Sequence, residues 1–544
     1  MTRAPSALAV VDIGRATTSV SLLARVGKAW RLLGTFAAPA GTAEQALLAV
    51  LAGRALRIDA GIDAQAELSP AALDAVPRLT ATSRPPATLV VLAASRRAVA
   101  DLTAEARRTG WRVEAASTDT HDPREMTELV LRRDVGAVLI GAGDPAGPDE
   151  RAALDDLAAL GGAAARRRPA LQVILGGAIR GRRAWLEALG ESPPGELTRF
   201  HEVPAVRRGE LGLRDVLESL LADPADGRQR LRATAESLAD VLDRRVELVE
   251  VGFEGGVRIM AGPGVAGGEP TSRAFVTAEG GLVPPEPDDE TIDAVLAWTA
   301  GSLDRHRMGD RLRDLRARPW VDAAGEGARL RLAAASAALA RMAALTPELT
   351  AEPAADVTIV TGGAFATAPP AAVILAVADT IRRPGVTQLV FDHARLLGPI
   401  GTIDDPAERR TLLKDLVRDA LVPLGSLIVT GGLGARRPGP GRDRARAGRL
   451  ELASDGSTTS HDLVAGEITF VELSPGLRAE ARLRFAEAVR FGRRTRHVTV
   501  PVTGGLAGLV LDLRDVPLRL PERRDRRRAM LADWSAKAWP GDER

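Results

Sequence analysis

The sequence predicts an α/β protein with two duplicated lobes, an inserted parallel α/β unit and a small C-terminal β-domain. Three observations lead to this prediction. An apolar strand, an acidic residue and a glycine turn follow one another within 8–25, and the same design returns within 246–257. A buried strand over 357–361 runs directly into a pair of glycines. Between 88 and 175, strand patterns alternate with helix patterns, which indicates a parallel sheet with crossover helices.

The first turn carries residues suited to binding phosphate. Asp12 lies at the end of an apolar strand, and Gly14, Thr17 and Thr18 share the tight turn that follows, before a strand expected over 19–25. An aspartate at a strand end can hold Mg²⁺ through water, and a glycine lets the backbone approach a phosphate closely. The two hydroxyls, with nearby N–H groups, can complete an anion cradle. The turn therefore predicts a phosphate hairpin with Asp12 at the metal, although the turn chemistry is also that of a plain β-hairpin.

The second lobe supplies two further candidate elements. Glu250 and Gly252 repeat the acid-x-glycine turn, and Thr361, Gly362 and Gly363 follow a buried strand. A backbone without side chains can lie flat against a base or a ribose, so the glycine pair predicts a nucleoside contact. The alternative explanations without a ligand are that Glu250 is a surface acid on a strand and that the two glycines form a tight turn.

Composition excludes several classes of function. The 544 residues include 45% hydrophobic residues, which suffice for buried cores, and the formal net charge is only +2, with no basic stretch interleaved with aromatic residues. We therefore expect no nucleic-acid partner. The absence of cysteine excludes disulfides and thiolate chemistry, and the six histidines have no metal-ligand spacing. No apolar run is long enough for a membrane span, so we expect a cytoplasmic protein without a membrane partner.

Changes in pattern along the chain predict the domain boundaries. Three opening strands are expected over 8–13, 19–25 and 30–37, and a helical pattern over 43–56 follows them. An arginine-rich helix is expected over 522–536. The expected parts are a first lobe with the phosphate hairpin at 1–80, the inserted parallel α/β unit at 81–226, the second lobe at 227–433, a Gly/Pro/Arg-rich linker at 434–448 and the C-terminal β-domain at 449–544.

Two hairpins of this design, with a strand-Thr-Gly-Gly element late in the second half, resemble the duplicated plan of the actin-like ATPase superfold of sugar kinases, heat-shock chaperones and actin. Within that superfold, the chain resembles the glutamate mutase L family (MutL, also called GlmL), found beside adenosylcobalamin-dependent mutases. The segments that carry this resemblance are Val11-Asp12-Ile13-Gly14-Arg15-Ala16-Thr17-Thr18, Val138-Leu139-Ile140-Gly141-Ala142-Gly143, Asp304-Arg305-His306, Ile359-Val360-Thr361-Gly362-Gly363-Ala364-Phe365, Phe391-Asp392-His393, Gly398-Pro399-Ile400-Gly401 and Gly504-Gly505-Leu506-Ala507-Gly508-Leu509-Val510-Leu511-Asp512-Leu513-Arg514.

The resemblance implies that ATP and Mg²⁺ bind between the two lobes and that the protein assists assembly or reactivation of an adenosylcobalamin-dependent mutase. The residues it implies at the ligand are Asp12, Gly14, Thr17 and Thr18 at phosphate and Mg²⁺, Glu250 and Gly252 on the opposite lobe, and Thr361, Gly362 and Gly363 at adenosine. The second hairpin departs from the family, since Gly255 and Gly256 stand where a threonine pair is usual. We therefore expect slow or absent hydrolysis.

Two other functions stay open at this stage. A non-hydrolysing interaction scaffold with the same fold would use the tail and the inserted unit to bind partners. A small-molecule kinase of the superfold is a weaker alternative, because it needs a catalytic carboxylate near the phosphoryl acceptor and the sequence nominates none.

Overall fold

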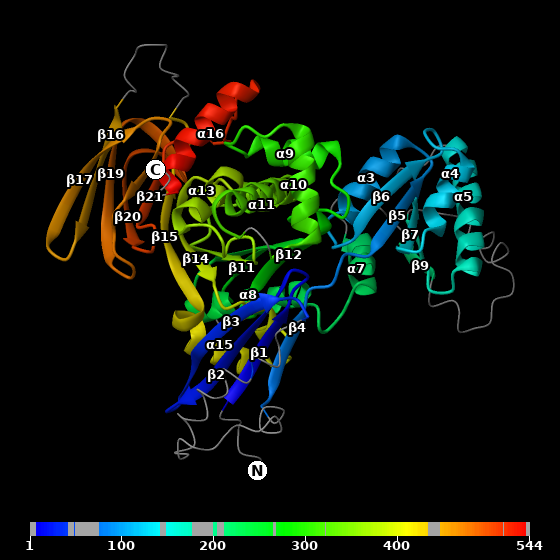
Figure 1. The fold of residues 1–544 in the computed structure, drawn as a ribbon, viewed down its shortest axis with the longest axis horizontal. Coiled ribbons are helices and arrows are strands. Elements are labelled where there is room, and N and C mark those ends of the chain that lie inside the picture. Colours follow the sequence, from blue (N-terminus) through cyan, green and yellow to red (C-terminus); the bar gives the residue numbers. More distant parts are fainter. Residues whose placement is uncertain are drawn as a thin grey trace. The chain divides into compact units, whose positions relative to one another are not determined.

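The computed structural model describes residues 7–41, 48, 76–141, 148–176, 200–203, 211–264, 268–320, 323–433, 446–514 and 516–539. They form two compact units (Figure 1). The first comprises Met1–Arg84, Pro224–Ala274 and Gly280–Arg544, and the second Pro85–Asp223 with Phe275–Glu279. The helix expected at 43–56, apart from the single helical residue Leu48, and most of the linker expected at 434–448 lie outside the described residues.

The first sheet of the larger unit contains the N-terminal hairpin. Its strands, in order across the sheet, are β3 (Ala29–Pro39), β2 (Thr17–Val26), β1 (Ala7–Ile13) and β4 (Arg78–Thr82). β2 pairs antiparallel with both β1 and β3, whereas β4 pairs parallel with β1. The three opening strands are those predicted. β4 was not predicted, because its five residues Arg-Leu-Thr-Ala-Thr contain no apolar run.

The second sheet repeats this arrangement. Its first four strands are β12 (Thr271–Thr277), β11 (Gly256–Gly262), β10 (Val246–Val251) and β13 (Val357–Thr361). As in the first sheet, the hairpin strands β10 and β11 pair antiparallel and the next neighbour, β13, pairs parallel with β10. This repeat of strand order and direction confirms the duplicated actin-like fold.

The second sheet continues into the C-terminal part of the chain. Its remaining strands are β14 (Gly385–Asp392), β15 (Leu421–Val429), β21 (Leu509–Asp512) and β18 (Ile468–Val471). A separate antiparallel sheet contains β17 (Ser457–Val464), β16 (Arg446–Ser454), β19 (Arg478–Phe491) and β20 (Arg493–Thr503). The strands expected in a C-terminal β-domain divide between two sheets: four form this separate antiparallel sheet, and β18 and β21 belong to the sheet of the second lobe.

Burial explains how the tail strands divide between the two sheets. All four residues of β21 are buried, so both of its faces need cover, as in the middle of a large sheet. β19 alternates between exposed and buried residues over most of its length, which suits a sheet with one face in water. The length and apolar character of the strands predicted their existence but not this difference in partners.

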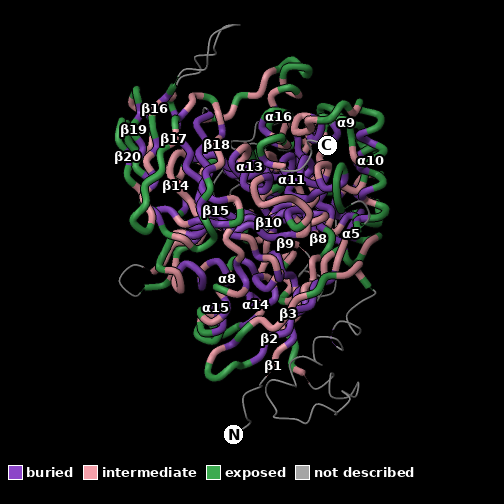
Figure 2. The backbone as a smooth tube through the Cα atoms, turned by 60° about the vertical axis from the view of Figure 1, so that its left-hand side comes forward, coloured by how far each residue is buried: buried purple, intermediate pink, exposed green. Residues whose placement is uncertain are grey.

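Helices cover the second sheet and contact the first. The helices of this unit are α8 (Gly227–Leu242), α9 (Asp289–Ala297), α10 (Arg305–Ala317), α11 (Gly325–Leu345), α12 (Pro347–Ala351), α13 (Pro370–Thr380), α14 (Leu397–Ile400), α15 (Pro406–Ala420) and α16 (Arg524–Ala538). Figure 2 shows buried residues concentrated in the strands of the second sheet and in α11 and α13. α15 packs against β3, and the backbone N–H of Trp30 donates a hydrogen bond to Asp415 (2.9 Å).

The smaller unit is the predicted parallel α/β unit. Its sheet order is β6 (Arg112–Ser117), β5 (Thr88–Ala93), β7 (Val135–Gly141), β8 (Gln172–Gly176) and β9 (Phe200–Val203), and all neighbours pair parallel. Its helices are α3 (Arg96–Ala106), α4 (Pro123–Leu131), α5 (Pro148–Arg167) and α7 (Leu211–Leu220). In the part of the chain described for both units, no helix has the length and apolar character needed to cross a bilayer.

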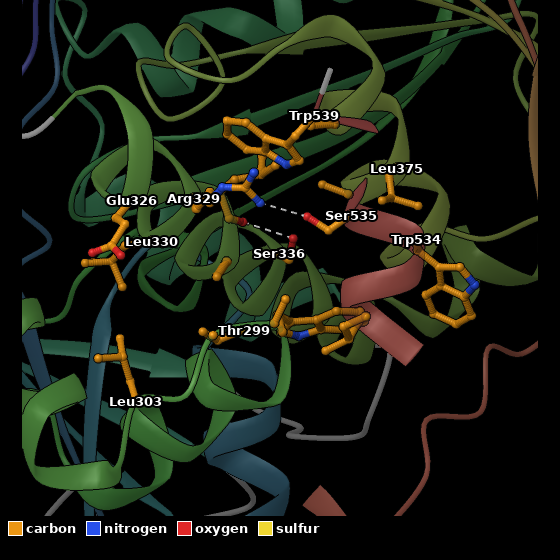
Figure 3. Close-up of a pocket in the computed structure, with 18 of the residues that line it drawn as sticks. Thr299, Leu303, Glu326, Arg329, Leu330, Ser336, Leu375, Trp534, Ser535 and Trp539 are labelled. Carbon is orange, nitrogen blue, oxygen red and sulfur yellow. Dashed lines mark hydrogen bonds between the residues drawn. The ribbon is translucent and has the colours of Figure 1, made fainter. Parts of the chain in front are cut away.

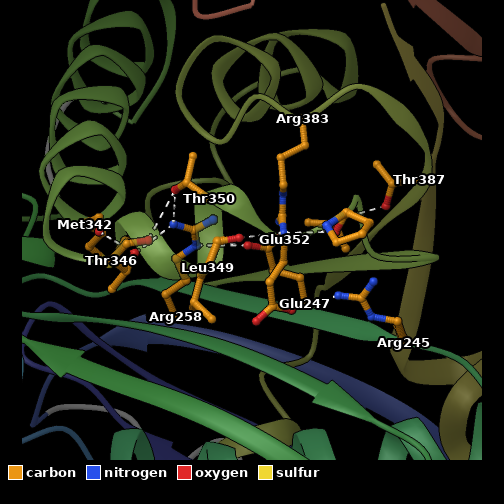
Figure 4. A network of polar contacts seen from close by, with 12 residues as sticks. Arg245, Glu247, Arg258, Met342, Thr346, Leu349, Thr350, Glu352, Arg383 and Thr387 are labelled. Carbon is orange, nitrogen blue, oxygen red and sulfur yellow. Dashed lines mark hydrogen bonds and ion pairs between the residues drawn. The ribbon is translucent and has the colours of Figure 1, made fainter. Parts of the chain in front are cut away.

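A buried ionic network involves both strands of the second hairpin and is centred on Glu247 of β10 (Figure 4). Glu247 is 1% exposed and accepts hydrogen bonds from Arg258 Nε of β11 (2.9 Å) and from Arg383. Arg258 also donates to the hydroxyls of Thr346 (2.7 Å) and Thr350 (3.0 Å). The network thereby connects β10 and β11 to the end of α11, to α12 and to the loop before β14.

We predict that Glu247→Ala lowers the free energy of unfolding by about 3–5 kcal/mol, because it leaves two buried arginines without their shared carboxylate. Urea denaturation measures the change. Asp293→Ala is the matched control, since it removes a carboxylate from an exposed arginine, Arg305, and should leave stability almost unchanged. Equal effects of the two substitutions would contradict the structural importance of this network.

Candidate functional site

A cavity of about 440 Å³ brings together the two hairpins and the Thr-Gly-Gly element. It lies within the larger unit, where residues from the ends of β1, β10 and β13 line it. The predicted residues that line it are Asp12, Gly14, Thr17, Glu250, Gly252, Thr361, Gly362 and Gly363. Segments separated by more than two hundred positions therefore converge at one cavity.

Thr18 is the one residue of the predicted set that does not line this cavity. It is the second residue of β2, where it is 4% exposed and pairs with Ile13. Successive side chains of a strand point to opposite faces, so Thr17 and Thr18 cannot both face the same ligand. The sequence predicted both hydroxyls in the turn because the strand was expected to begin at Ser19, whereas β2 begins at Thr17.

Both hairpin glycines are required by the turns themselves. The N–H of Gly14 donates to the carbonyl of Thr17 (2.9 Å), and the N–H of Gly252 donates to the carbonyl of Gly255 at the same distance. A Cβ on Gly14 would lie 2.8 Å from the oxygen of Thr17, and one on Gly252 would lie 2.6 Å from that of Gly255. These two N–H groups therefore close the turns and are not available to a phosphate.

The glycine pair after β13 is likewise placed by contacts within the protein. Gly362 has φ +106°, and a Cβ there would lie 2.3 Å from the carbonyl oxygen of Val251 at the end of β10. A Cβ on Gly363 would lie 2.7 Å from the guanidinium of Arg395. Thr361 donates its hydroxyl to Asp392 (3.2 Å). The pair lets the ends of β13 and β10 meet and makes room for an arginine.

Arg395 is a site residue that the sequence did not nominate. Its Nη1 donates to the hydroxyl of Thr17 (2.6 Å) and lies 4.0 Å from a carboxylate oxygen of Asp12. The side chain is 15% exposed, and the backbone has φ +52°. In the sequence, Arg395 follows closely after Phe391-Asp392-His393, one of the segments that carry the family resemblance. The residues that it contacts, Thr17 and Asp12, lie near the start of the chain.

The charges around the cavity favour an anion. Five arginines line it, against three carboxylates. The arginines are Arg15, Arg84, Arg228, Arg331 and Arg395, and the carboxylates are Asp12, Glu250 and Glu254. An excess of guanidinium groups, which bind phosphate through paired hydrogen bonds, suits a phosphate-bearing ligand.

Burial moves two of these carboxylates toward the neutral form. It raises the pKa of Glu250 to about 8, and the nearby Arg228 offsets the rise only in part. Burial also raises the pKa of Asp12 to about 6, against the opposing effect of Arg395. The Oε2 atom of Glu250 is buried without a hydrogen-bond partner among the described residues. Glu250 is therefore mostly protonated at neutral pH, which further increases the positive excess.

The guanidinium of Arg395 opposes a Mg²⁺ ion at Asp12. The Thr17 hydroxyl already accepts a hydrogen bond from a guanidinium, and that same guanidinium faces Asp12. Among the described residues, no three carboxylates or imidazoles converge as a ligand set. Magnesium prefers several oxygen ligands in octahedral geometry, and a neighbouring cation opposes its binding.

A second cavity of about 440 Å³ lies under the C-terminal helix α16 (Figure 3). Three of the chain's seven tryptophans line it, Trp298, Trp534 and Trp539. The guanidinium of Arg329 lies 4.6 Å from the ring centre of Trp539 and donates to Ser535 (3.1 Å). This cavity contains none of the residues predicted for the site, and its polar contacts hold α16 in place.

No protein-family model matches the sequence, and no curated protein matches it. Among solved structures, the chain is similar to the type II variant of the Aquifex aeolicus Ppx/GppA phosphatase, with 8% identity over 77% of this chain and 94% of that one and a TM-score of 0.19. Another Aquifex aeolicus Ppx/GppA structure gives 11% identity over 77% and 92%, with a TM-score of 0.19.

A reductive activator for a corrinoid, iron-sulfur protein is similar at 12% identity, over 77% of this chain and 63% of that one, with a TM-score of 0.23. These low scores carry no argument about this chain. The assignment of the actin-like fold therefore rests on the repeated strand order.

We predict that the stability of the protein falls as pH rises from about 5 to about 8.5. The native state keeps a proton on Glu250 up to a pKa of about 8, whereas the unfolded chain releases it near 4.5, so folding is favoured at lower pH in this window. Glu250→Gln should flatten this dependence, as measured by urea midpoints at pH 5.5 and 8.5. The exposed Glu408→Gln is the control and should keep the wild-type slope. An unchanged slope in Glu250→Gln would refute the assignment.

Proposed function

We propose that this protein binds ATP in the cavity between the hairpins and acts as an accessory protein rather than as a fast enzyme. One observation carries the proposal: the two hairpins and the Thr-Gly-Gly element, which the sequence singles out independently, line the same cavity. In a fold with two lobes, a ligand held between them can change how the lobes close, which is a suitable output for an accessory protein.

The phosphate end of ATP is proposed to lie at the first hairpin. Arg395 and Arg228 line the cavity together with Asp12 and Thr17. Guanidinium groups in a partly buried site bind phosphate oxygens through charge-assisted hydrogen bonds, which are stronger than neutral ones. This assignment keeps Asp12 and Thr17 at the ligand but gives the main binding role to arginine.

The adenine end is proposed to contact aromatic residues. Trp320 lines the same cavity and is 49% exposed, and Phe253 lines it from the second hairpin. An exposed tryptophan at the edge of an anion-binding cavity offers a flat surface on which a base can stack. Neither aromatic residue was nominated from the sequence, because single aromatic residues in loops carry no periodic pattern.

Slow or absent hydrolysis follows from the second hairpin. Its turn exposes Phe253 and Glu254 to the cavity and has no hydroxyl, while the only hydroxyl of the first hairpin at the cavity is already bonded to Arg395. Glu250, with its raised pKa, is mostly neutral and is a poor general base at neutral pH.

The proposed partner follows from the sequence resemblance to the glutamate mutase L family. We propose that the ATP-bound protein assists assembly or reactivation of an adenosylcobalamin-dependent mutase. Adding the protein with ATP to the inactivated mutase tests this role. Recovery of mutase activity that needs both supports it, and recovery that is independent of ATP contradicts it. A non-hydrolysing scaffold that binds no nucleotide is the alternative.

ATP should raise the melting temperature of the full chain, because a ligand that binds only the folded state stabilises it.

We predict that Trp320→Ala weakens ATP binding about tenfold, through loss of base stacking, and leaves inorganic triphosphate binding unchanged. Isothermal titration calorimetry measures both ligands.

Phe36→Ala is the matched control for this substitution. Phe36 is 52% exposed on β3 and does not line the cavity, so its removal should leave both affinities unchanged. Equal ATP binding by the wild type and Trp320→Ala would remove Trp320 from the site.

A further inference from the structure

We propose that the guanidinium of Arg395 stands in place of a divalent cation in this cavity, so that the ligand's phosphates bind directly to the protein without Mg²⁺. The inference rests on the proposed function, because it concerns how the phosphates of the same ligand are held. It differs from the expectation drawn from the sequence, in which Asp12 contacts a metal ion.

The position of the guanidinium carries the first part of the argument. Arg395 contacts two of the three oxygen-bearing side chains of the first hairpin that the sequence assigned to the metal and phosphate, Thr17 at 2.6 Å and Asp12 at 4.0 Å. A guanidinium has five N–H donors, and the bond to Thr17 uses one of them. The group therefore offsets the charge of Asp12 and still has donors for phosphate oxygens.

The surrounding backbone is shaped to hold this side chain. Gly363 lies against the guanidinium so closely that a Cβ would be 2.7 Å from Nη2. A side chain at this position would require the guanidinium of Arg395 to shift. One member of the glycine pair, which the sequence assigned to adenosine, thus provides space for the arginine.

The loop that carries Arg395 is fixed on both sides. Asp392 accepts hydrogen bonds from the N–H groups of Leu396 (3.0 Å) and Leu397 (3.3 Å), and Ser21 of β2 donates to the carbonyl of Ala394 (3.2 Å). Arg395 itself has φ +52°, a conformation that is unfavourable for a residue with a side chain and that persists where neighbouring contacts impose it. These contacts hold the guanidinium at the hairpin before any ligand binds.

Calorimetry of the full chain with ATP, in EDTA and in excess Mg²⁺, tests the inference. We expect the wild type to bind with the same affinity in both buffers. Arg395→Gly removes the guanidinium and relieves the positive φ, so it should fold. In EDTA it should lose tenfold or more in ATP affinity, which is the effect of removing a charge-assisted hydrogen bond. Arg395→Lys keeps one charge without the planar fork and should bind with intermediate affinity.

Asp455→Gly is the matched control. Asp455 also has a positive φ, of 43°, and lies in the exposed turn between β16 and β17, away from the cavity. Its replacement by glycine should leave ATP affinity unchanged in both buffers. A change in ATP affinity in Asp455→Gly equal to that in Arg395→Gly would overturn the assignment of the effect to the guanidinium.

The remaining outcomes separate this inference from the proposed function. Wild-type binding that requires Mg²⁺ would overturn the inference and leave ATP binding intact. Mg²⁺-independent binding that Arg395→Gly retains in full would also overturn it, because the guanidinium would then not contact the ligand. A wild type that binds no ATP in either buffer would overturn the proposed function itself.

Discussion

The contact between Gly362 and the carbonyl of Val251 fixes the geometry on which the cavity depends. It brings the end of β13 against the end of β10, so the glycine pair lies beside the turn of the second hairpin. The next residue, Gly363, then leaves room for Arg395, which reaches across to Thr17 of the first hairpin. The two lobes are joined at the cavity by side chains, Arg395 to Thr17 and Arg15 to Glu254.

The sequence predicted the repeated hairpins and the strand before the glycine pair because these features are local: an apolar run, an acid and a turn residue lie within a few positions. Arg395, Trp320 and Thr18 show what local patterns cannot supply. The role of Arg395 arises from a contact with a residue 378 positions away, and Trp320 belongs to no periodic pattern. Thr18 was predicted in the turn, but β2 begins at Thr17, so the alternation of the strand directs the Thr18 side chain away from the cavity.

The geometry of the two turns explains why glycine occupies both hairpin positions, without any ligand. Each closes its own turn with its N–H, and a side chain at either position would collide with the turn's carbonyl. The glycine of an acid-x-glycine motif therefore indicates the shape of the turn. It says something about the neighbouring acid only because that shape determines where the acid lies. In the proposed ATP site, the arginines and aromatic residues that line the cavity would supply the ligand specificity instead.

The position of β21 between β15 and β18 has a consequence for how the chain is made. The second lobe's sheet receives this strand from Leu509–Asp512, after the four strands of the separate antiparallel sheet have already been synthesised. Until then, the edge of β15 that later pairs with β21 has no partner from its own sheet. Completion of this sheet therefore waits until Leu509–Asp512 has been synthesised, and before then the nascent chain carries an open strand edge of the kind that favours aggregation.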